Sequence, residues 1–228
     1  MSGRSATLRI AINATADNSQ WTGIGQYAKS LLDAVGRSHS PHRWYLLASA
    51  PRPPAHLHTR VVLVDARVPA WEQLQLPTIL TDHRIEVYHN PAFGLPIVKP
   101  CPCICTLHDC IPRLFPDLVT PALRGFFAQW APSWVRLADH LICVSEHTKH
   151  DVIHLYGADP ERCTVIYQSV PDYFRPLEDE QLIAGVKAKY GIDKPYLLFV
   201  GAWSCARTYL GCWRPSNGCW RRKARTGS

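Results

Sequence analysis

Short apolar runs alternate with amphipathic stretches along the first 200 residues, and this alternation constrains the fold more than any other feature of the chain. Runs of strand length include Thr7–Asn13, Arg60–Asp65 and Cys101–Leu107, whereas helical spacing of apolar residues follows Gly23 and Thr120. Strands that alternate with helices are typical of a parallel sheet covered by helices. The sequence therefore predicts an α/β protein with a Rossmann-like, doubly wound and mostly parallel sheet.

Local signals mark several expected boundaries. Pro77 should kink or split a helical stretch at Ala70–Asp82, because proline lacks the backbone N–H that a helix interior requires. Ser145 is a predicted N-cap for a helix that closes at Gly157. The last expected strand is Tyr196–Val200.

The character of the chain changes at Gly201. Residues 202–228 contain no Asp or Glu and no apolar run of strand length, but they hold six of the 25 Lys and Arg residues. Residues 1–201 hold the other 19 basic residues and all 18 acidic ones, so their net charge is only +1. The remaining +6 of the net charge of +7 lies in residues 202–228. Because a nucleic-acid partner requires a basic face on a folded domain, we expect none.

The cysteines and the hydropathy of the chain indicate in which cellular compartment the protein is expected. The N-terminus lacks the apolar core of a signal peptide, and no apolar stretch reaches the roughly 18–20 residues that span a bilayer. The nine cysteines are therefore interpreted as reduced thiols of a cytoplasmic protein. Peripheral contact with the inner face of the membrane stays open as an alternative.

A cluster of thiols raises the question of a metal site. Cys101, Cys103 and Cys105 alternate along one expected strand, with His108 and Cys110 just beyond it. Zinc sites more often use two cysteines spaced across a turn. Buried thiols on one face of the strand are the favoured interpretation, and no metal site is predicted.

A glycine-rich turn opens the first helix. Gly23 and Gly25 leave backbone N–H groups free to bind an anion, and with Ala28 they fit the G-x-G-x-x-A pattern of dinucleotide-binding proteins. That pattern should follow its strand directly, whereas roughly ten residues intervene here, and no ribose-binding acid follows. A phosphate-binding turn, an ordinary helix start and a nicotinamide-dependent oxidoreductase all remain open.

His108 and Asp109 follow the carboxyl end of an expected strand. Ligand clefts of open α/β sheets form at this edge. An imidazole beside a carboxylate can hydrogen-bond a sugar or transfer a proton, and the alternative is a structural histidine.

Four aromatic residues at helical spacing, Phe126, Phe127, Trp130 and Trp134, form a stripe. Core packing is the favoured interpretation, and a membrane-facing patch is the alternative.

Short motifs in a fixed order resemble the N-terminal half of the group-one glycosyltransferases, a large retaining family with the GT-B fold. The motifs include Gly23-Ile24-Gly25-Gln26-Tyr27, His89-Asn90-Pro91, Phe93-Gly94-Leu95-Pro96, Thr106-Leu107-His108-Asp109, Val144-Ser145-Glu146, Phe174-Arg175-Pro176 and Lys194–Gly201. The match covers roughly residues 7–201 and is most similar to mannosyltransferase-type members.

The resemblance implies two Rossmann-like domains that face each other across a cleft. Residues 1–175 would form the acceptor-side domain, 176–195 a linker helix, and 196–201 the first strand of a donor-binding domain that is otherwise missing. Residues 202–228 would be an out-of-frame or disordered basic tail. The implied reaction transfers a hexose, with mannose favoured, from a nucleotide sugar to a glycan or lipid-linked acceptor, with retention and without a cofactor.

The resemblance also implies roles for particular residues. The donor diphosphate would lie beside the loop of Gly23, Ile24 and Gly25. The catalytic residues near the transferred sugar would be His108 and Asp109. The cleft or acceptor site would be lined by Tyr27, His89, Asn90, Ser145 and Glu146.

The chain departs from the family pattern after Gly201. The Arg-Lys pair that usually neutralises the leaving diphosphate is absent from its expected place, because residues 202–208 contain Arg207 but no Lys. The family's two Glu separated by seven residues are also absent, because no Glu follows Glu180. We therefore expect a truncated form with little or no transferase activity. A non-enzymatic binding domain with a basic tail is the further alternative.

Overall fold

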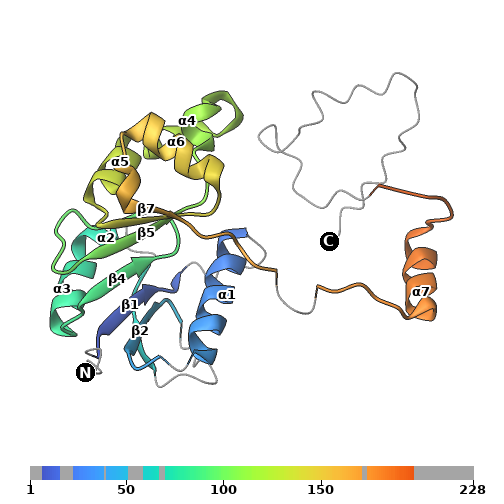
Figure 1. Ribbon diagram of the computed structural model, residues 1–228, viewed down its shortest axis with the longest axis horizontal. Coiled ribbons are helices and arrows are strands. Elements are labelled where there is room, and N and C mark those ends of the chain that lie inside the picture. Colours follow the sequence, from blue (N-terminus) through green and yellow to red (C-terminus); the bar gives the residue numbers. More distant parts are fainter. Residues whose placement is uncertain are drawn as a thin grey trace.

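The computed structural model describes residues 7–15, 23–38, 40–50, 59–66, 70–170 and 174–197. Within them, seven strands form one sheet in the order β3-β2-β1-β4-β5-β6-β7, and every neighbouring pair is parallel (Figure 1). The predicted α/β class with a Rossmann-like sheet is confirmed, and across the described strands the sheet is wholly rather than mostly parallel.

The strands are β1 (Arg9–Asn13), β2 (Arg43–Ala48), β3 (Thr59–Leu63), β4 (Val87–Asn90), β5 (Cys103–Leu107), β6 (His140–Cys143) and β7 (Cys163–Val165). The helices are α1 (Gly23–Arg37), α2 (Trp71–Leu74), α3 (Leu76–Asp82), α4 (Ile111–Leu114), α5 (Pro121–Leu137), α6 (Glu146–Tyr156) and α7 (Glu180–Tyr190). Short 3-10 turns lie at Pro116–Leu118 and Pro160–Arg162.

The predicted helix boundaries agree with the capping chemistry. The Ser145 side chain accepts a hydrogen bond from the Thr148 N–H at the start of α6, and Gly157 ends that helix in the left-handed conformation. The stretch around Pro77 is split into α2 and α3, which meet at Gln75. These three predictions are confirmed.

The strand order places a topological switch point between β1 and β4. The chain leaves β1 for β2 on one side, whereas it leaves β4 for β5 on the other. All strands run in the same direction, so Asn13, Asn90 and Leu107 end at one edge of the sheet. In open α/β sheets, the crevice at such an edge is where ligands bind.

The two faces of the sheet bury separate cores because alternate strand residues point to opposite faces. Ile12 of β1 packs with Leu32 of α1 on one face. Ala11 belongs to the larger core on the other face, with Leu80 of α3 and Trp134 of α5. Figure 1 shows α1 on one side of the strands and α2 and α3 on the other.

The aromatic stripe of α5 faces this larger core. Phe127 and Trp134 are buried, with ring centroids 5.7 Å apart, and Phe93 lies edge-on to Phe127 at 4.8 Å. Trp130 is partly buried against the same cluster. The core interpretation is confirmed for these residues, whereas Phe126 is 49% exposed.

The thiols are buried as expected. Cys101, Cys103, Cys105 and Cys110 are free cysteines in the interior, although Cys101 precedes β5 rather than lying within it. Burial raises the pKa of the Cys105 thiol to about 12, so it is neutral at physiological pH.

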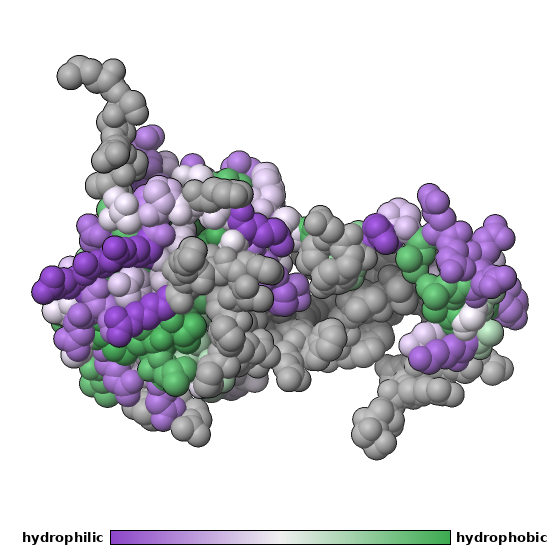
Figure 2. Space-filling view, turned by 90° about the horizontal axis from the view of Figure 1, so that it is seen from below, coloured by the Kyte–Doolittle hydropathy of each residue, from purple (hydrophilic) through white to green (hydrophobic). Residues whose placement is uncertain are grey.

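The C-terminal part of the described chain lies apart from these cores. Leu182, Val186 and Tyr190 of α7 are exposed, and no residue of this helix is buried (Figure 2). Tyr196 and Leu197 form no strand. Residues 198–228 lie outside the described part, so the expected strand at 196–201 and the basic tail stay predictions.

We predict that Trp134→Ala lowers the free energy of unfolding by about 3–5 kcal/mol, because truncating a buried aromatic residue leaves a cavity. Phe126→Ala on the same helix is the matched control and should cost far less, because its ring is half exposed. Urea unfolding of the two variants measures the difference. Equal losses would show that the stripe does not face the core.

Candidate functional site

The carboxyl ends of β1 and β4 are joined by one carboxylate. The side-chain amides of Asn13 and Asn90, both buried, donate to Oε1 of Glu72 over 3.2 and 3.1 Å. Glu72 lies in α2, which is distant in sequence from both strands. The two strands that flank the switch point therefore share one acceptor.

Each asparagine also shapes the loop that follows its own strand. The Asn13 Oδ1 accepts from the Thr15 N–H at 3.0 Å and from the Thr15 hydroxyl at 2.7 Å. The Asn90 Oδ1 accepts from the Ala92 N–H at 3.1 Å, while its amide donates to the Gly94 carbonyl at 2.8 Å. Both loops are thus held by Asx-type turns.

The position of Glu72 is fixed by its neighbours in α2. Trp71 is buried, and the Gln73 side chain bonds the Leu95 carbonyl at 3.0 Å and the Ile97 N–H at 2.9 Å. Burial raises the pKa of Glu72 to about 7, against the smaller opposing effect of the Asn90 hydrogen bond. This carboxyl therefore exchanges its proton near neutral pH.

Two further residues are adapted to this carboxyl group. Gly94 has a φ of +121°, and a Cβ there would overlap the Glu72 carboxylate, so only glycine fits. The Tyr88 hydroxyl is fully buried and has no hydrogen-bond partner within the described part of the chain. Burial, together with the nearby Glu72 charge, raises the pKa of Tyr88.

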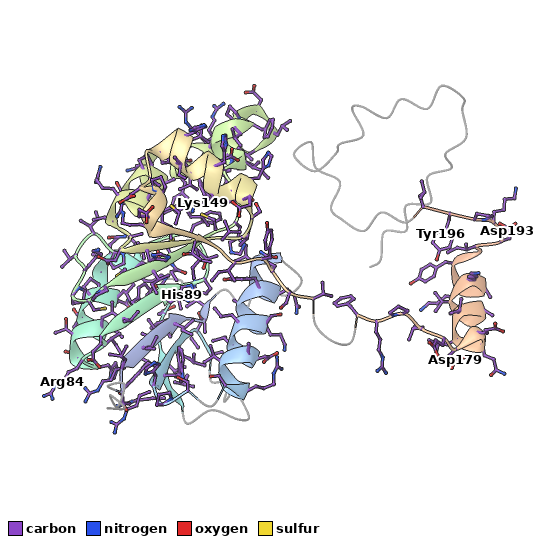
Figure 3. All side chains as sticks on the ribbon, viewed as in Figure 1. Arg84, His89, Lys149, Asp179, Asp193 and Tyr196 are labelled. Carbon is purple, nitrogen blue, oxygen red and sulfur yellow. The ribbon has the colours of Figure 1, made fainter. Side chains whose placement is uncertain are left out.

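A second cluster is centred on the Thr106 hydroxyl at the end of β5. It lies 2.9 Å from Nε2 of His89 and 3.4 Å from the hydroxyl of Tyr27 in α1. Burial lowers the pKa of His89 to about 4 and leaves its imidazole neutral. Figure 3 shows His89 near the middle of the sheet domain.

His108 is held in one tautomer. Its Nε2 lies 2.8 Å from the Pro91 carbonyl oxygen, which can only accept, so Nε2 carries the proton. Its Nδ1 then accepts from the Gln168 amide at 3.1 Å. The Tyr27 ring packs edge-on against the imidazole at 5.0 Å. Burial lowers the pKa of His108, which favours the neutral ring.

The structure therefore brings four of the predicted residues, Tyr27, His89, Asn90 and His108, to one edge of the sheet. Of the predicted loop, Gly25 is buried and Gly23 is exposed at the start of α1. Ile24 lies between them and is half-buried.

The other three predicted residues, Asp109, Ser145 and Glu146, make no side-chain hydrogen bond to the Thr106 cluster in the described part of the chain. Asp109 accepts from the Ile111 N–H at 2.9 Å, which forms an Asx-type turn just before α4. Ser145 caps α6, and its partner Thr148 donates to the His108 carbonyl at 3.1 Å. Glu146 is exposed in the first turn of α6.

The sequence analysis did not identify Asn13, Glu72 and Gln168 as parts of this edge. One signal was present: both β1 and β4 end in asparagine. Nothing local points to Glu72 or Gln168, because the partners of Glu72 lie 59 and 18 positions away and the partner of Gln168 lies 60 positions away.

Within the described ranges, no group of three or more His, Cys, Asp or Glu is arranged to hold a metal ion. None of the described helices combines the length and apolar character needed to cross a bilayer.

Glu72 should make the stability fall as the pH rises. Its pKa in the folded chain, about 7, lies above its ordinary value of 4.5, so its contribution is fully present below pH 4.5 and lost progressively up to about pH 7. The loss is at most about 3 kcal/mol. Glu72→Gln keeps an oxygen acceptor and should remove this dependence, as measured by urea unfolding between pH 4.5 and 8. The exposed residue Glu161, changed to Gln, is the control; an unchanged slope in Glu72→Gln would contradict the account.

Gln168 should control the protonation of His108. In Gln168→Glu a carboxylate faces Nδ1 and cannot donate to it, so the pKa of His108 should rise by about one pH unit. Gln168→Ala removes the hydrogen-bond donor without adding a charge and should change the pKa of His108 less. Nitrogen-15 NMR of the imidazole reports both the pKa and the Nε2–H tautomer. A wild-type spectrum of the Nδ1–H tautomer would contradict the assignment.

Comparison with known proteins gives three results. No curated protein matches the sequence. A glycosyltransferase from Rickettsia africae is 13% identical, and the match covers 83% of this chain and 51% of that one with a TM-score of 0.44. Anabaena Alr3699/HepE in complex with UDP-glucose is 16% identical, and its match covers 81% of this chain and 50% of that one with a TM-score of 0.51.

The chain therefore spans about half the length of these two solved structures. At this identity, the likeness to the Anabaena protein concerns the fold alone. The sequence gives the more specific result, because the profile of one family matches residues 21–172, well over half of the 228 residues. The chain belongs to Glycosyltransferase Family 4.

Proposed function

We propose that residues 1–175 form the acceptor-side domain of a retaining glycosyltransferase that uses a nucleotide-sugar donor. The observation that carries this proposal is the convergence of Tyr27, His89 and His108 on the carboxyl edge of the sheet, beside the switch point, in a chain of this family. Residues 176–195 would link this domain to a donor-binding region that begins at 196–201. A hexose, mannose first, is the sugar to test, with a glycan or lipid-linked acceptor.

The hydrogen bonds of His108 suggest how it would contact the sugar. Nε2–H is engaged by the Pro91 carbonyl, so this proton is not available to a ligand. Nδ1 faces the exposed Gln168 amide. A sugar hydroxyl that displaces this amide would donate to Nδ1, and the neutral ring would then position the sugar rather than protonate it. Asp109 would act beside it, through its charge on the imidazole.

The start of α1 would bind the donor diphosphate. This helix has 15 residues, and its first turn contains no acid that would compensate the positive end of the helix dipole. Gly23 is exposed, and an added Cβ would meet no described atom within 4 Å. The absence of a side chain leaves room for a phosphate to approach the backbone.

The remaining predicted cleft residues would support the binding site or contact the acceptor. His89 and Asn90 are buried and would hold the floor of the cleft by their contacts with Thr106 and Glu72. Ser145 and Glu146 lie at the start of α6, beside the loop that carries His108, where Glu146 is free to meet an acceptor hydroxyl.

Saturation-transfer NMR with GDP-mannose and UDP-glucose tests the proposal on the 228-residue chain. We expect weak binding in which the sugar protons receive saturation, and a loss of several-fold in His108→Ala, because the imidazole is the proposed sugar contact. His147→Ala, an exposed histidine on α6, is the matched control.

Two outcomes would contradict the proposal: no saturation of either donor, or saturable binding of NADH, which would revive the oxidoreductase alternative. The same samples should show no sugar transfer, because residues 202–208, directly after Gly201, hold Arg207 but no Lys to complete the pair that neutralises the leaving diphosphate. Measured turnover would overturn that expectation of inactivity but would support the transferase assignment. If salt-sensitive nucleic-acid binding disappears with deletion of residues 202–228, the tail is a binding element.

A further inference from the structure

Like charges meet at the opposite, amino-terminal edge of the sheet. Arg9 and Arg43 begin β1 and β2 and are direct partners in the register of these strands. Side chains paired in this way lie on the same face of a sheet, where like charges destabilise each other. This arrangement costs stability unless an anion lies between the two guanidinium groups.

A third arginine reaches the same place from a strained backbone position. Arg84 follows α3 with a φ of +50°, and it closes the helix through its N–H to the Thr81 carbonyl at 2.9 Å. Glycine is the usual residue at this left-handed position, because it carries no Cβ. An arginine there is retained at a cost to the backbone, which suggests that its side chain has a use.

The three arginines line one hollow of about 560 Å³, together with Thr7 and Glu86. This volume lies in the range of small-molecule sites. Glu86 is the only acid of the lining among the described residues, and its Oε2 accepts from the Arg9 backbone N–H at 2.9 Å. In the part of the chain that the structure describes, none of the three guanidinium groups forms an ion pair.

The charge of this hollow is local. Residues 1–201 contain 19 basic and 18 acidic residues, so a general excess of base does not explain three arginines around one acid. Guanidinium groups match the oxygens of phosphate in paired hydrogen bonds better than other cations do. A phosphate is therefore the anion that this hollow fits best.

We propose that Arg9, Arg43 and Arg84 form a second binding site, for a phosphate group carried by a soluble metabolite or by a lipid headgroup. The site is separate from the candidate sugar-binding edge, because it lies at the amino ends of the strands. Figure 3 shows Arg84 at the lower edge of the sheet domain, away from His89, and Figure 2 shows strongly hydrophilic residues gathered on the side seen from below. It requires no transferase activity and stands independently of it.

Calorimetric titration of the 228-residue chain with inorganic pyrophosphate, and co-sedimentation with phosphatidylcholine vesicles with and without phosphatidic acid, test the proposal. Arg84→Gly is the decisive variant, because glycine suits the backbone at this position and should keep or raise the melting temperature. We expect the affinity to fall about tenfold or more, as the loss of a charged hydrogen bond implies. Arg43→Gln should act in the same direction.

Arg124→Ala, an exposed arginine at the start of α5, is the matched control and should leave binding unchanged. Arginine-dependent binding of pyrophosphate would identify a soluble phosphate ligand, and binding of phosphatidic acid vesicles alone would identify a headgroup. The proposal is overturned if neither probe binds. It is equally overturned if Arg84→Gly and Arg43→Gln bind as the wild type does, or if Arg124→Ala weakens binding to the same extent.

Discussion

The buried carboxyl of Glu72 is the interaction on which the arrangement of the carboxyl edge depends. A parallel sheet aligns its strand ends but does not by itself fix the loops that leave them. Here one oxygen accepts from Asn13 and from Asn90, and each asparagine uses its own oxygen to fold the loop beyond its strand. The loop after β1 and the loop after β4 therefore share one fixed point at the switch point of the sheet.

The same interactions also determine the position of His108, which lies at the carboxyl edge of the sheet. Asn90 folds the loop that contains Pro91, and the Pro91 carbonyl sets the tautomer of His108. Burial keeps the imidazoles of His89 and His108 neutral, so neither ring is prepared to act as a strong acid. Such an edge can position a neutral, hydroxyl-rich ligand by hydrogen bonds. A sugar fits this chemistry better than a ligand that requires proton transfer.

Much of the fold could be predicted because its causes are local. The apolar periodicity of each segment gave the α/β class, and Ser145, Gly157 and Pro77 marked helix boundaries through side chains and torsions that act within a few residues. The short helix α4 was missed because its four residues are fewer than a periodic pattern needs. The motifs also located His89, Asn90 and His108 at strand ends, where the direction of a parallel sheet brings them together.

The remaining parts of the site could not be predicted because they depend on packing between distant segments. In the sequence, Glu72 is an ordinary residue of an amphipathic stretch. It gains its two asparagine partners only because α2 packs at the carboxyl ends of β1 and β4. Gln168 contacts His108 because β7 lies at the edge of the sheet, beyond β6. The turn that Asp109 forms with the Ile111 N–H before α4 was also not predicted, and its role beside His108 stays a prediction.

We propose above all that the carboxyl edge beside the switch point binds the sugar nucleotide. The most direct test is to map backbone amide shifts of the 228-residue chain during titration with millimolar GDP-mannose and UDP-glucose. We expect the largest shifts at Thr15, Ala92, His108 and Gln168, which surround that edge. Shifts confined to the amino-terminal edge around Arg9 and Arg84, or no shifts at all, would contradict it.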